Sequence, residues 1–311
     1  MFTINRRNIF FLSSLFIIFG IFLRLYNLNF ESYWWDEILA FWIDDPNISY
    51  EETYARKNLT DQSSFLYHII LKSFYEVVGY NSELGRFVPF FFGIIAIPLL
   101  AILSYQIKSN YSFSLTILLA SVNVYLIFYS QENRHYTFIF LLSVINLIYF
   151  FKIFFSEKSN YKQIYIYLLF IFFSLIGLSE HPFILIILFS QIVYSVYCLI
   201  IFKKRNYLFF FLVLLILIIY LLLNYDFLTQ NLMSKEHHFV SQPDWNFLYD
   251  FFFPRFFGSL IMGLIYLCIL LFLIINFRKK IFLVPNKYLL LVFIIIFSYL
   301  IPFVYGFYFL P

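Results

Sequence analysis

Long apolar runs separated by short polar segments dominate the chain and predict transmembrane helices. An α-helix rises about 1.5 Å per residue, so about 20 apolar residues cross the ~30 Å hydrocarbon core of a bilayer. Most of the runs are long enough to do so, and they lie near residues 9–23, 87–107, 112–130, 136–155, 164–178, 183–202, 207–224, 256–277 and 288–310. The pattern predicts an all-α, polytopic transmembrane helix bundle with about nine spans.

The first of these runs, residues 9–23, follows the basic pair Arg6-Arg7 and precedes Arg24. No small-residue cleavage site follows it, as a removed signal peptide would require. We therefore expect a retained first transmembrane helix.

Residues 64–78 have a different pattern. As a helix these 15 residues would extend about 22 Å, which is short of the ~30 Å core. Ser64, His68, Lys72 and Glu76 recur at every fourth position and share one helical face, while apolar side chains cover the other. The segment is predicted to be an amphipathic helix lying in the membrane interface.

The basic residues indicate the orientation. If residues 64–78 do not span, 13 of the 21 Lys and Arg residues fall on one side, and by the positive-inside rule this side is cytoplasmic. If they do span, the basic clusters at 203–205 and 278–280 face outward beside an inward Arg6-Arg7. We adopt the first topology, that of a multi-pass cell-membrane protein with a cytoplasmic N-terminus. The 13 residues are Arg6, Arg7, Lys108, Lys152, Lys158, Lys162, Lys203, Lys204, Arg205, Arg278, Lys279, Lys280 and Lys287.

Polar chemistry is then expected on the outer side. Of the 17 acidic residues only Glu157 lies inside, which leaves the other 16 outside. The outer segments are a first loop at 27–86, turns at 130–136 and 179–182, and a loop at 225–255. Ionisable groups that are costly in lipid lie in each segment, so the four segments can form one site.

Composition agrees with a membrane protein, since 63% of residues are hydrophobic, 12% are charged and the mean hydropathy is +0.85. No linker or internal repeat divides the chain, so residues 1–311 are expected to form a single membrane domain. In this domain, residues 1–155 form a module that includes the loop 27–86, and residues 156–311 add helices and the loop 225–255. The net charge of +4 is dispersed in short clusters, so no face for nucleic acid is expected. Cys198 and Cys268 lie inside apolar runs and indicate neither a disulfide framework nor a zinc site.

The most conspicuous polar feature is the acidic pair Asp36-Glu37, just after the first apolar run. Tyr33, Trp34, Trp35 and Trp42 flank it. Tyr and Trp collect at the boundary between lipid and water, so the pair is expected at that depth. Two acids at the membrane surface can do chemistry on a lipid-borne substrate.

Four segments in the first 155 residues form an ordered set. They are Arg24-Leu25-Tyr26-Asn27-Leu28, Trp35-Asp36-Glu37, Glu83-Leu84-Gly85-Arg86-Phe87-Val88-Pro89 and Tyr129-Ser130-Gln131-Glu132-Asn133-Arg134-His135-Tyr136. With these segments the chain resembles the membrane glycosyltransferases of the C-type superfamily, in particular the Rgt-like and protein O-mannosyltransferase branch that uses polyprenyl-phosphate sugars. Beyond about residue 160 only the general pattern is similar, and a chain ending at Pro311 leaves both a short member and a fragment open.

The resemblance implies a polyprenyl-phosphate sugar as donor, juxtamembrane helices in the first outer loop, and Asp36 as the general base of an inverting transfer. Adjacent carboxylates repel each other when both are ionised, so Glu37 is a candidate for contact with a metal or with the acceptor. Whether a divalent metal is used stays open.

Arg86 and Arg134 are suited to the leaving phosphate, because guanidinium groups offer paired donors to phosphate oxygens. Snorkelling of an Arg at a helix end to the interface is an equally ordinary explanation. By the resemblance, Gln131 and Glu132 line the sugar or metal pocket, and the alternative is a hydrated turn.

Further candidates for substrate binding lie later in the chain. Glu180 and His181 end an apolar run on the outer side, where Pro182 could simply begin the next helix. Lys235 lies in the loop 225–255 beside His237 and His238, where a solvated surface is the alternative to phosphate binding or gating.

The preferred hypothesis is an integral membrane glycosyltransferase that acts on the non-cytoplasmic side. Its partners would be membrane lipid, a polyprenyl-phosphate-linked sugar, and a lipid, glycan or protein acceptor. One alternative is a lipid or solute transporter, because ionisable groups inside a bundle also mark transport paths. Another is a non-catalytic scaffold for polysaccharide assembly, in which the acids would be dispensable.

Overall fold

The structure is a computed structural model that describes residues 6–60, 65–107, 110–155, 162–203, 207–223, 244–250, 253, 259–281 and 287–309. Regular structure in these ranges is helical throughout, without a strand, which confirms the predicted all-α class. Contacts divide the chain into two compact units, Met1–Pro182 and Phe183–Pro311. The prediction of a single membrane domain is not tested by this division.

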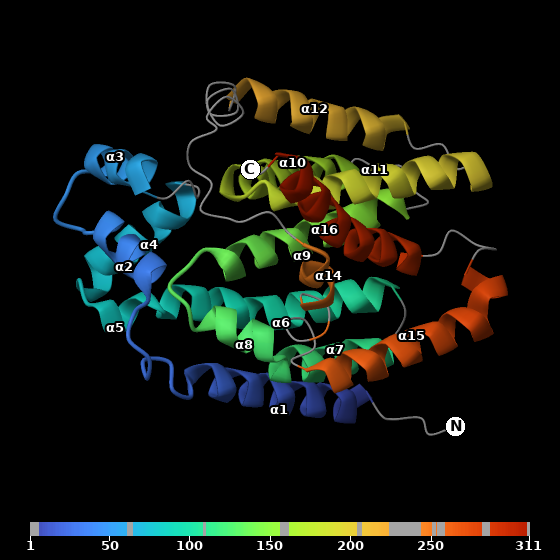
Figure 1. The fold of residues 1–311 in the computed structure, drawn as a ribbon, viewed down its shortest axis with the longest axis horizontal. Coiled ribbons are helices and arrows are strands. Elements are labelled where there is room, and N and C mark those ends of the chain that lie inside the picture. Colours follow the sequence, from blue (N-terminus) through green and yellow to red (C-terminus); the bar gives the residue numbers. More distant parts are fainter. Residues whose placement is uncertain are drawn as a thin grey trace. The chain divides into compact units, whose positions relative to one another are not determined.

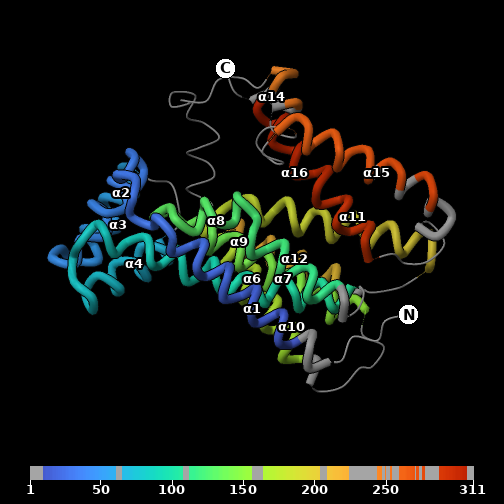
Figure 2. Tube along the Cα trace, turned by 90° about the horizontal axis from the view of Figure 1, so that it is seen from below, coloured from blue at the N-terminus to red at the C-terminus, as the bar shows by residue number. Residues whose placement is uncertain are grey.

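The central helix of the first unit is α6, which packs against α1, α7 and α9, while α10 packs against α9. The short helices α2 to α5 gather at one end of this unit, beyond the end of α1 and the start of α6 (Figures 1 and 2). The bounds are α1 (Arg6–Leu25), α2 (Trp35–Ile43), α3 (Tyr50–Thr60), α4 (Phe65–Val78), α5 (Ser82–Gly85), α6 (Phe87–Ile107), α7 (Asn110–Val122), α8 (Val124–Ser130), α9 (Tyr136–Phe154) and α10 (Lys162–Glu180).

The second unit is built around α11 and α16, which pack together partly through the rings of Phe189 and Phe297. Its helices are α11 (Phe183–Phe202), α12 (Tyr207–Leu223), α14 (Trp245–Asp250), α15 (Leu260–Ile281) and α16 (Lys287–Phe309). Most of the predicted loop 225–255, including Lys235, His237 and His238, lies outside the described residues.

In the ranges that the structure describes, eight of the nine predicted apolar runs correspond to one helix each, and the run 112–130 forms the two helices α7 and α8. Over the described residues, four helices are long and apolar enough to cross a membrane, or five if the bent pair Ser112–Val122 and Val124–Ser130 is one span. The chain therefore has the helices of a membrane protein, while the count of about nine spans stays a prediction. The four are Ser82–Ile107, Tyr136–Phe154, Phe183–Phe202 and Lys287–Gly306, and shorter apolar helices are Phe10–Leu25, Ile164–Glu180, Phe209–Leu223 and Leu260–Ile269.

The run at 112–130 is not one straight helix, contrary to its uniform apolar pattern. It breaks at Asn123, and the two parts are bent by 57°. Asn123 has an extended backbone, and its side-chain oxygen accepts a hydrogen bond from the Leu126 backbone N–H, which caps the start of α8. A polar capping residue can thus interrupt a hydrophobic run that hydropathy alone reads as continuous.

The amphipathic segment predicted at 64–78 forms α4, but its polar face is partly buried. His68 and Lys72 are each 1% exposed, whereas Glu76 on the same face is exposed. The apolar side, through Leu71, packs into the core of the first unit. Ser64 lies outside the described residues. The polar face of α4 thus packs against α3 and against the segment that precedes α3.

Candidate functional site

The acidic pair lies in the first turn of α2, and the two carboxylates have opposite surroundings. Successive residues of a helix point about 100° apart. Glu37 faces the protein interior and is 0% exposed, and Ala40 and Ile43 of the same helix are buried on the same side. The side chain of Asp36 is 34% exposed. Only Asp36 is accessible to a substrate.

Glu37 is held by Arg86 in a two-pronged ion pair. Nε of Arg86 donates to Oε1 at 2.9 Å and Nη2 donates to Oε2 at 2.7 Å. The backbone N–H of Asn133 donates to Oε1 at 2.7 Å, and that of Trp34 donates to Oε2 at 3.4 Å. The carboxylate of Glu37 is thus satisfied by the protein itself.

Arg86 is equally committed to groups within the protein. Its Nη1 donates to the carbonyl oxygens of Leu28 at 3.0 Å and Glu31 at 2.8 Å. These contacts tie the chain between α1 and α2 to the start of α6. The predicted roles of Arg86 at a phosphate and of Glu37 at a metal or acceptor therefore compete with a buried pair, and a structural role fits these contacts better.

Arg134 is the cation beside Asp36. Its Nη1 donates to the backbone carbonyl of Asp36 at 3.4 Å, and its Nη2 lies 4.0 Å from Oδ2 of the carboxylate. The guanidinium also lies over the ring of Tyr136, with 5.9 Å to the ring centroid. The structure thus brings together an accessible carboxylate and a largely buried cation, as predicted from their neighbouring segments.

Glu132 lies in the same turn, between α8 and α9. Burial raises the pKa of Glu132 to about 7, the negative charge of Glu37 adds to this shift, and the positive charge of Arg134 opposes it. Its Oε2 is buried and has no hydrogen-bond partner among the described residues. A protonated Glu132 can therefore donate a hydrogen bond near Asp36.

The amide nitrogen of Gln131 is engaged at the end of α1, and the predicted role of this residue in a sugar or metal pocket stays a prediction. Its Nε2 donates to the backbone carbonyls of Arg24 at 3.0 Å and Tyr26 at 2.8 Å, at the end of α1. Its side chain thus caps a helix C-terminus, a role that only the three-dimensional arrangement reveals.

Glu180 and His181 lie at the end of α10, on the same side of the first unit as the turn between α8 and α9. Glu180 is 2% exposed, and the ring of His181 stacks on that of His135 with 5.9 Å between centroids. His135 follows Arg134 directly, so this predicted pair borders the turn. Lys235 lies outside the described residues, so the structure does not place it.

Asn133 and three tyrosines form a buried polar cluster that the sequence did not single out. The Asn133 side chain accepts a hydrogen bond from Tyr67 Oη at 3.2 Å and donates to the hydroxyls of Tyr33 and Tyr75 at 3.4 and 3.5 Å. At Gly85 an added Cβ would come closer than 3.0 Å to polar atoms of this cluster, at Tyr33, Tyr75 and Asn133. The glycine before Arg86 was the signal that could have revealed the close approach.

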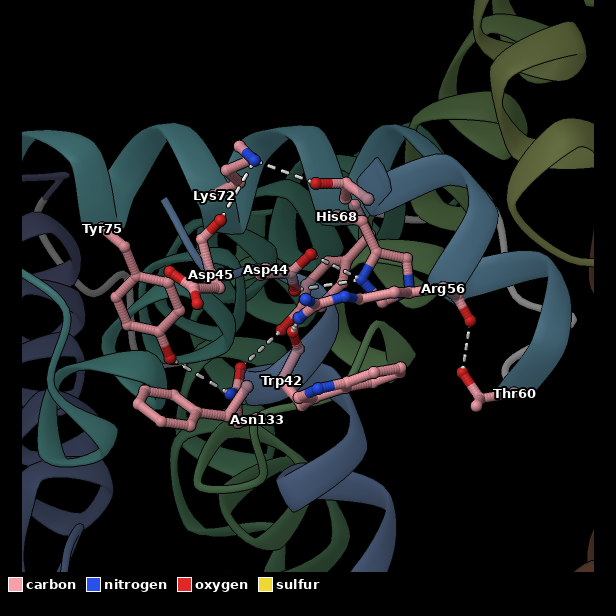
Figure 3. Close-up of polar contacts among 12 residues, drawn as sticks. Trp42, Asp44, Asp45, Arg56, Thr60, His68, Lys72, Tyr75 and Asn133 are labelled. Atoms are coloured by element: carbon pink, nitrogen blue, oxygen red, sulfur yellow. Dashed lines mark hydrogen bonds and ion pairs between the residues drawn. The ribbon is translucent and has the colours of Figure 1, made fainter. Parts of the chain in front are cut away.

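A second missed group joins α2, α3 and α4. Nδ1 of His68 lies 2.9 and 3.0 Å from the two carboxylate oxygens of Asp44, and both side chains are buried (Figure 3). Lys72 donates to the carbonyls of Asp45 at 3.0 Å and Ile48 at 2.6 Å. These contacts fix the end of α2 to α4 and so hold the helix that bears Asp36.

Arg56 of α3 completes this corner. Its guanidinium lies 4.4 Å from the centroid of a Trp42 ring, and its Nη1 donates to the Trp42 carbonyl at 2.9 Å (Figure 3).

In the part of the chain that the structure describes, no group of three or more His, Cys, Asp or Glu side chains could hold a metal ion.

Comparisons with protein-family models, with curated protein sequences and with solved structures give no significant match.

Proposed function

We propose that the chain is an integral membrane glycosyltransferase that takes a sugar from a polyprenyl-phosphate donor. The acceptor is a hydroxyl group of a lipid, glycan or protein on the non-cytoplasmic side. The observation that carries this proposal is the placement of Asp36. Its accessible carboxylate lies in a helix turn fixed by the buried pair Glu37–Arg86, with the Arg134 guanidinium 4.0 Å away.

The proposed reaction is a single displacement. Asp36 accepts the proton of the acceptor hydroxyl while the hydroxyl oxygen forms a bond to the anomeric carbon. The bond from this carbon to the phosphate oxygen breaks, and the electron pair stays on the departing polyprenyl phosphate. Attack from the opposite face inverts the anomeric carbon. Arg134 offsets the negative charge that grows on the phosphate, as a preorganised cation does.

The proposal includes a topology with about nine spans, a cytoplasmic N-terminus, and α2 to α5 in the first outer loop. Trp35, Ile38 and Trp42 on one side of α2 are 68%, 47% and 42% exposed, whereas Glu37 and Ala40 on the other side are buried. Tryptophan and aliphatic side chains on one side of a short helix are suited to the membrane interface. This distribution supports a site at the depth of lipid headgroups.

The direct test is a transfer assay with the purified full chain in lipid nanodiscs and a radiolabelled polyprenyl-phosphate sugar. General-base removal by Asp36→Asn is expected to lower the transfer rate by about 10²–10⁴-fold. The matched control is Glu31→Gln, an exposed acid of the same loop, which should transfer normally. Equal transfer by the native chain and Asp36→Asn would refute the assignment of the base.

A second candidate function, lipid or solute transport, is supported by the broken helix at Asn123. Transporters commonly build their substrate sites from interrupted membrane helices. Reconstituted liposomes distinguish the two functions, because a transporter moves a labelled substrate across the bilayer without forming a glycosidic bond. Movement without transfer, insensitive to Asp36→Asn, would favour this candidate over the glycosyltransferase.

A further inference from the structure

A fully buried cation within the first unit has no role in the proposed reaction. Arg24, in the last turn of α1, is 0% exposed. Its guanidinium donates to the carbonyls of Gly20 at 3.0 Å, Ala120 at 3.0 Å and Ser121 at 3.1 Å. Ala120 and Ser121 lie at the end of α7, whose last carbonyls lose their helical partners at the break. Arg24 therefore caps α7, where a cation is also favoured by the helix dipole.

Gln131 makes the converse contact. It follows α8 directly, and its Nε2 donates to the carbonyls of Leu23, Arg24 and Tyr26 at 3.5, 3.0 and 2.8 Å. The end of α1 thus caps α7 through Arg24, and the residue after α8 caps α1 through Gln131. The side chains of Arg24 and Gln131 thus connect α1 to both parts of the broken helix, α7 and α8.

Two glycines allow α1 and α6 to pack closely against the broken helix formed by α7 and α8. A Cβ at Gly20 would lie 2.8 Å from Oγ of Ser121, and a Cβ at Gly93 would lie 2.8 Å from Cβ of Ser130 and 3.6 Å from Nε of Arg24. The backbones of α1 and α6 therefore approach the broken helix closely. Because the packing is close, a displacement of the backbone at Asn123 should shift α8 and, with it, the turn that follows α8.

That turn is the one that meets α2. The backbone N–H of Asn133 donates to Oε1 of Glu37 at 2.7 Å, and Arg134 lies beside Asp36. The turn is consequently fixed on one side by the caps on α1 and on the other by Glu37. Its place decides how far the Arg134 guanidinium lies from the Asp36 carboxylate.

We propose that Arg24 and Gln131 are positioning residues that set the turn of residues 131–135 against Asp36. This inference rests on the proposed function for its kinetic consequence, but its structural consequence is independent of any activity. Neither side chain touches the substrate in this account. Each acts through Asn133 and Arg134.

The structural test is hydrogen–deuterium exchange of the Asn133 backbone amide in the full chain in nanodiscs. Arg24→Met and Gln131→Met keep side-chain bulk but remove the donors, and each is expected to raise exchange of this amide by about 10-fold through local opening. Arg24→Lys, which keeps an ammonium donor, should restore part of the protection. The matched control is Asn146→Ala, which removes a buried hydrogen bond of 2.8 Å to Ser174 between α9 and α10 and should leave the amide protected.

The kinetic test measures transfer by the same variants. A turn displaced by about 1 Å is expected to lower kcat by about 10²-fold with little change in KM for the donor. Because both caps act on one turn, the double variant should lose less than the product of the single losses. Asn146→Ala should reduce thermal stability while kcat of the folded protein is retained.

The outcomes separate the two proposals. Unchanged exchange at Asn133 in both Met variants, or exchange raised equally by Asn146→Ala, overturns the positioning role. Raised exchange in the Met variants supports it even if the native chain transfers no sugar, a result that would refute the proposed function alone. Raised exchange together with unaltered kcat would show that the turn's position does not govern the reaction, and would overturn the kinetic part of the inference.

Discussion

Two neighbouring charge pairs at the end of the first unit differ in almost every physical property. Glu37 and Arg86 are 0% and 6% exposed in their side chains and are joined by two short hydrogen bonds. Asp36 and Arg134 are 34% and 9% exposed, and their charged atoms approach only to 4.0 Å. The first pair neutralises itself inside the protein. The second keeps an accessible carboxylate with a cation 4.0 Å away.

Two acids that are adjacent in a sequence can therefore have different roles. Because successive residues of a helix point in different directions, the Asp36 carboxylate lies at the protein surface and the Glu37 carboxylate lies in the core. A buried acid requires a partner, because an isolated buried charge is strongly unfavourable. Glu37 meets this requirement with Arg86 and so anchors the turn. Asp36 has no such requirement and remains available for proton transfer.

Breaking the buried pair should have the largest effect on stability. Arg86→Met leaves the Glu37 charge in the interior without its partner, and we expect a loss of about 3–5 kcal/mol. Thermal unfolding of the detergent-purified protein, followed by circular dichroism, measures it. The double variant Glu37→Leu with Arg86→Met removes both charges and should be more stable than Arg86→Met alone. A double variant no more stable than the single variant would argue against a mutual ion pair.

Crowding the polar cluster next to this pair should have the next largest effect. Gly85→Ala would place a Cβ closer than 3.0 Å to atoms of Tyr33, Tyr75 and Asn133. Such overpacking commonly costs about 1–3 kcal/mol. The matched control is Gly79→Ala, where nothing lies within 4 Å of the added Cβ but φ is +100°, so that only backbone strain is introduced. Equal stability of Gly85→Ala and the native chain would mean that the cluster is looser than described.

The stability of the folded protein should also depend on pH through Glu132. The pKa of Glu132 is raised to about 7 from 4.5, so the unfolded chain ionises this group before the folded protein does. Below about pH 4.5 Glu132 is protonated in both states and does not affect the free energy of unfolding. As the pH rises from about 4.5 to 7, the folded state loses stability relative to the unfolded chain. Glu132→Gln should reduce this loss, measured as the change in Tm between pH 5 and pH 7. An unaltered pH dependence in the variant would contradict the buried position of Glu132.

The smallest effect on stability is expected at the open pair. Arg134→Gln replaces a largely buried guanidinium with an amide that can still donate hydrogen bonds, so we expect a loss of only about 1 kcal/mol. The transfer rate should fall much more than the stability, because the cation would face the departing phosphate. Measuring both quantities on one preparation checks this. A large loss of stability with normal transfer by the folded protein would reverse the roles of the two pairs.

The hydrophobic pattern predicted the helical segments well, because each apolar run must bury or shield its backbone as a helix. It missed the break at Asn123, since hydropathy does not register a single capping residue within a run of apolar neighbours. The structure also buries His68 and Lys72 of α4, whose spacing predicted a helix in the interface. Amphipathic spacing reports which residues share a face, but it does not reveal what covers that face.

The sequence predicted which residues gather around Asp36, but only part of what each of them contacts. Asp36, Arg134 and Glu132 come together as their neighbouring motifs indicated. The pairing of Glu37 with Arg86 and the capping by Gln131 depend on contacts between residues separated by 49 or more positions, such as 107 for Gln131 and Arg24. A single sequence does not encode such partners in any local pattern. Lys235 lies outside the described residues, and its role stays a prediction.

Single-turnover transfer with Asp36→Asn tests whether Asp36 performs the chemistry while Glu37 holds it in place. The assay uses folded protein in nanodiscs, saturating polyprenyl-phosphate sugar and a parallel measurement of Tm. We predict a rate lower by about 10²–10⁴-fold with Tm unchanged within about 1 °C, since an exposed carboxylate contributes little to stability. Transfer at the native rate by Asp36→Asn would show that Asp36 is not the general base.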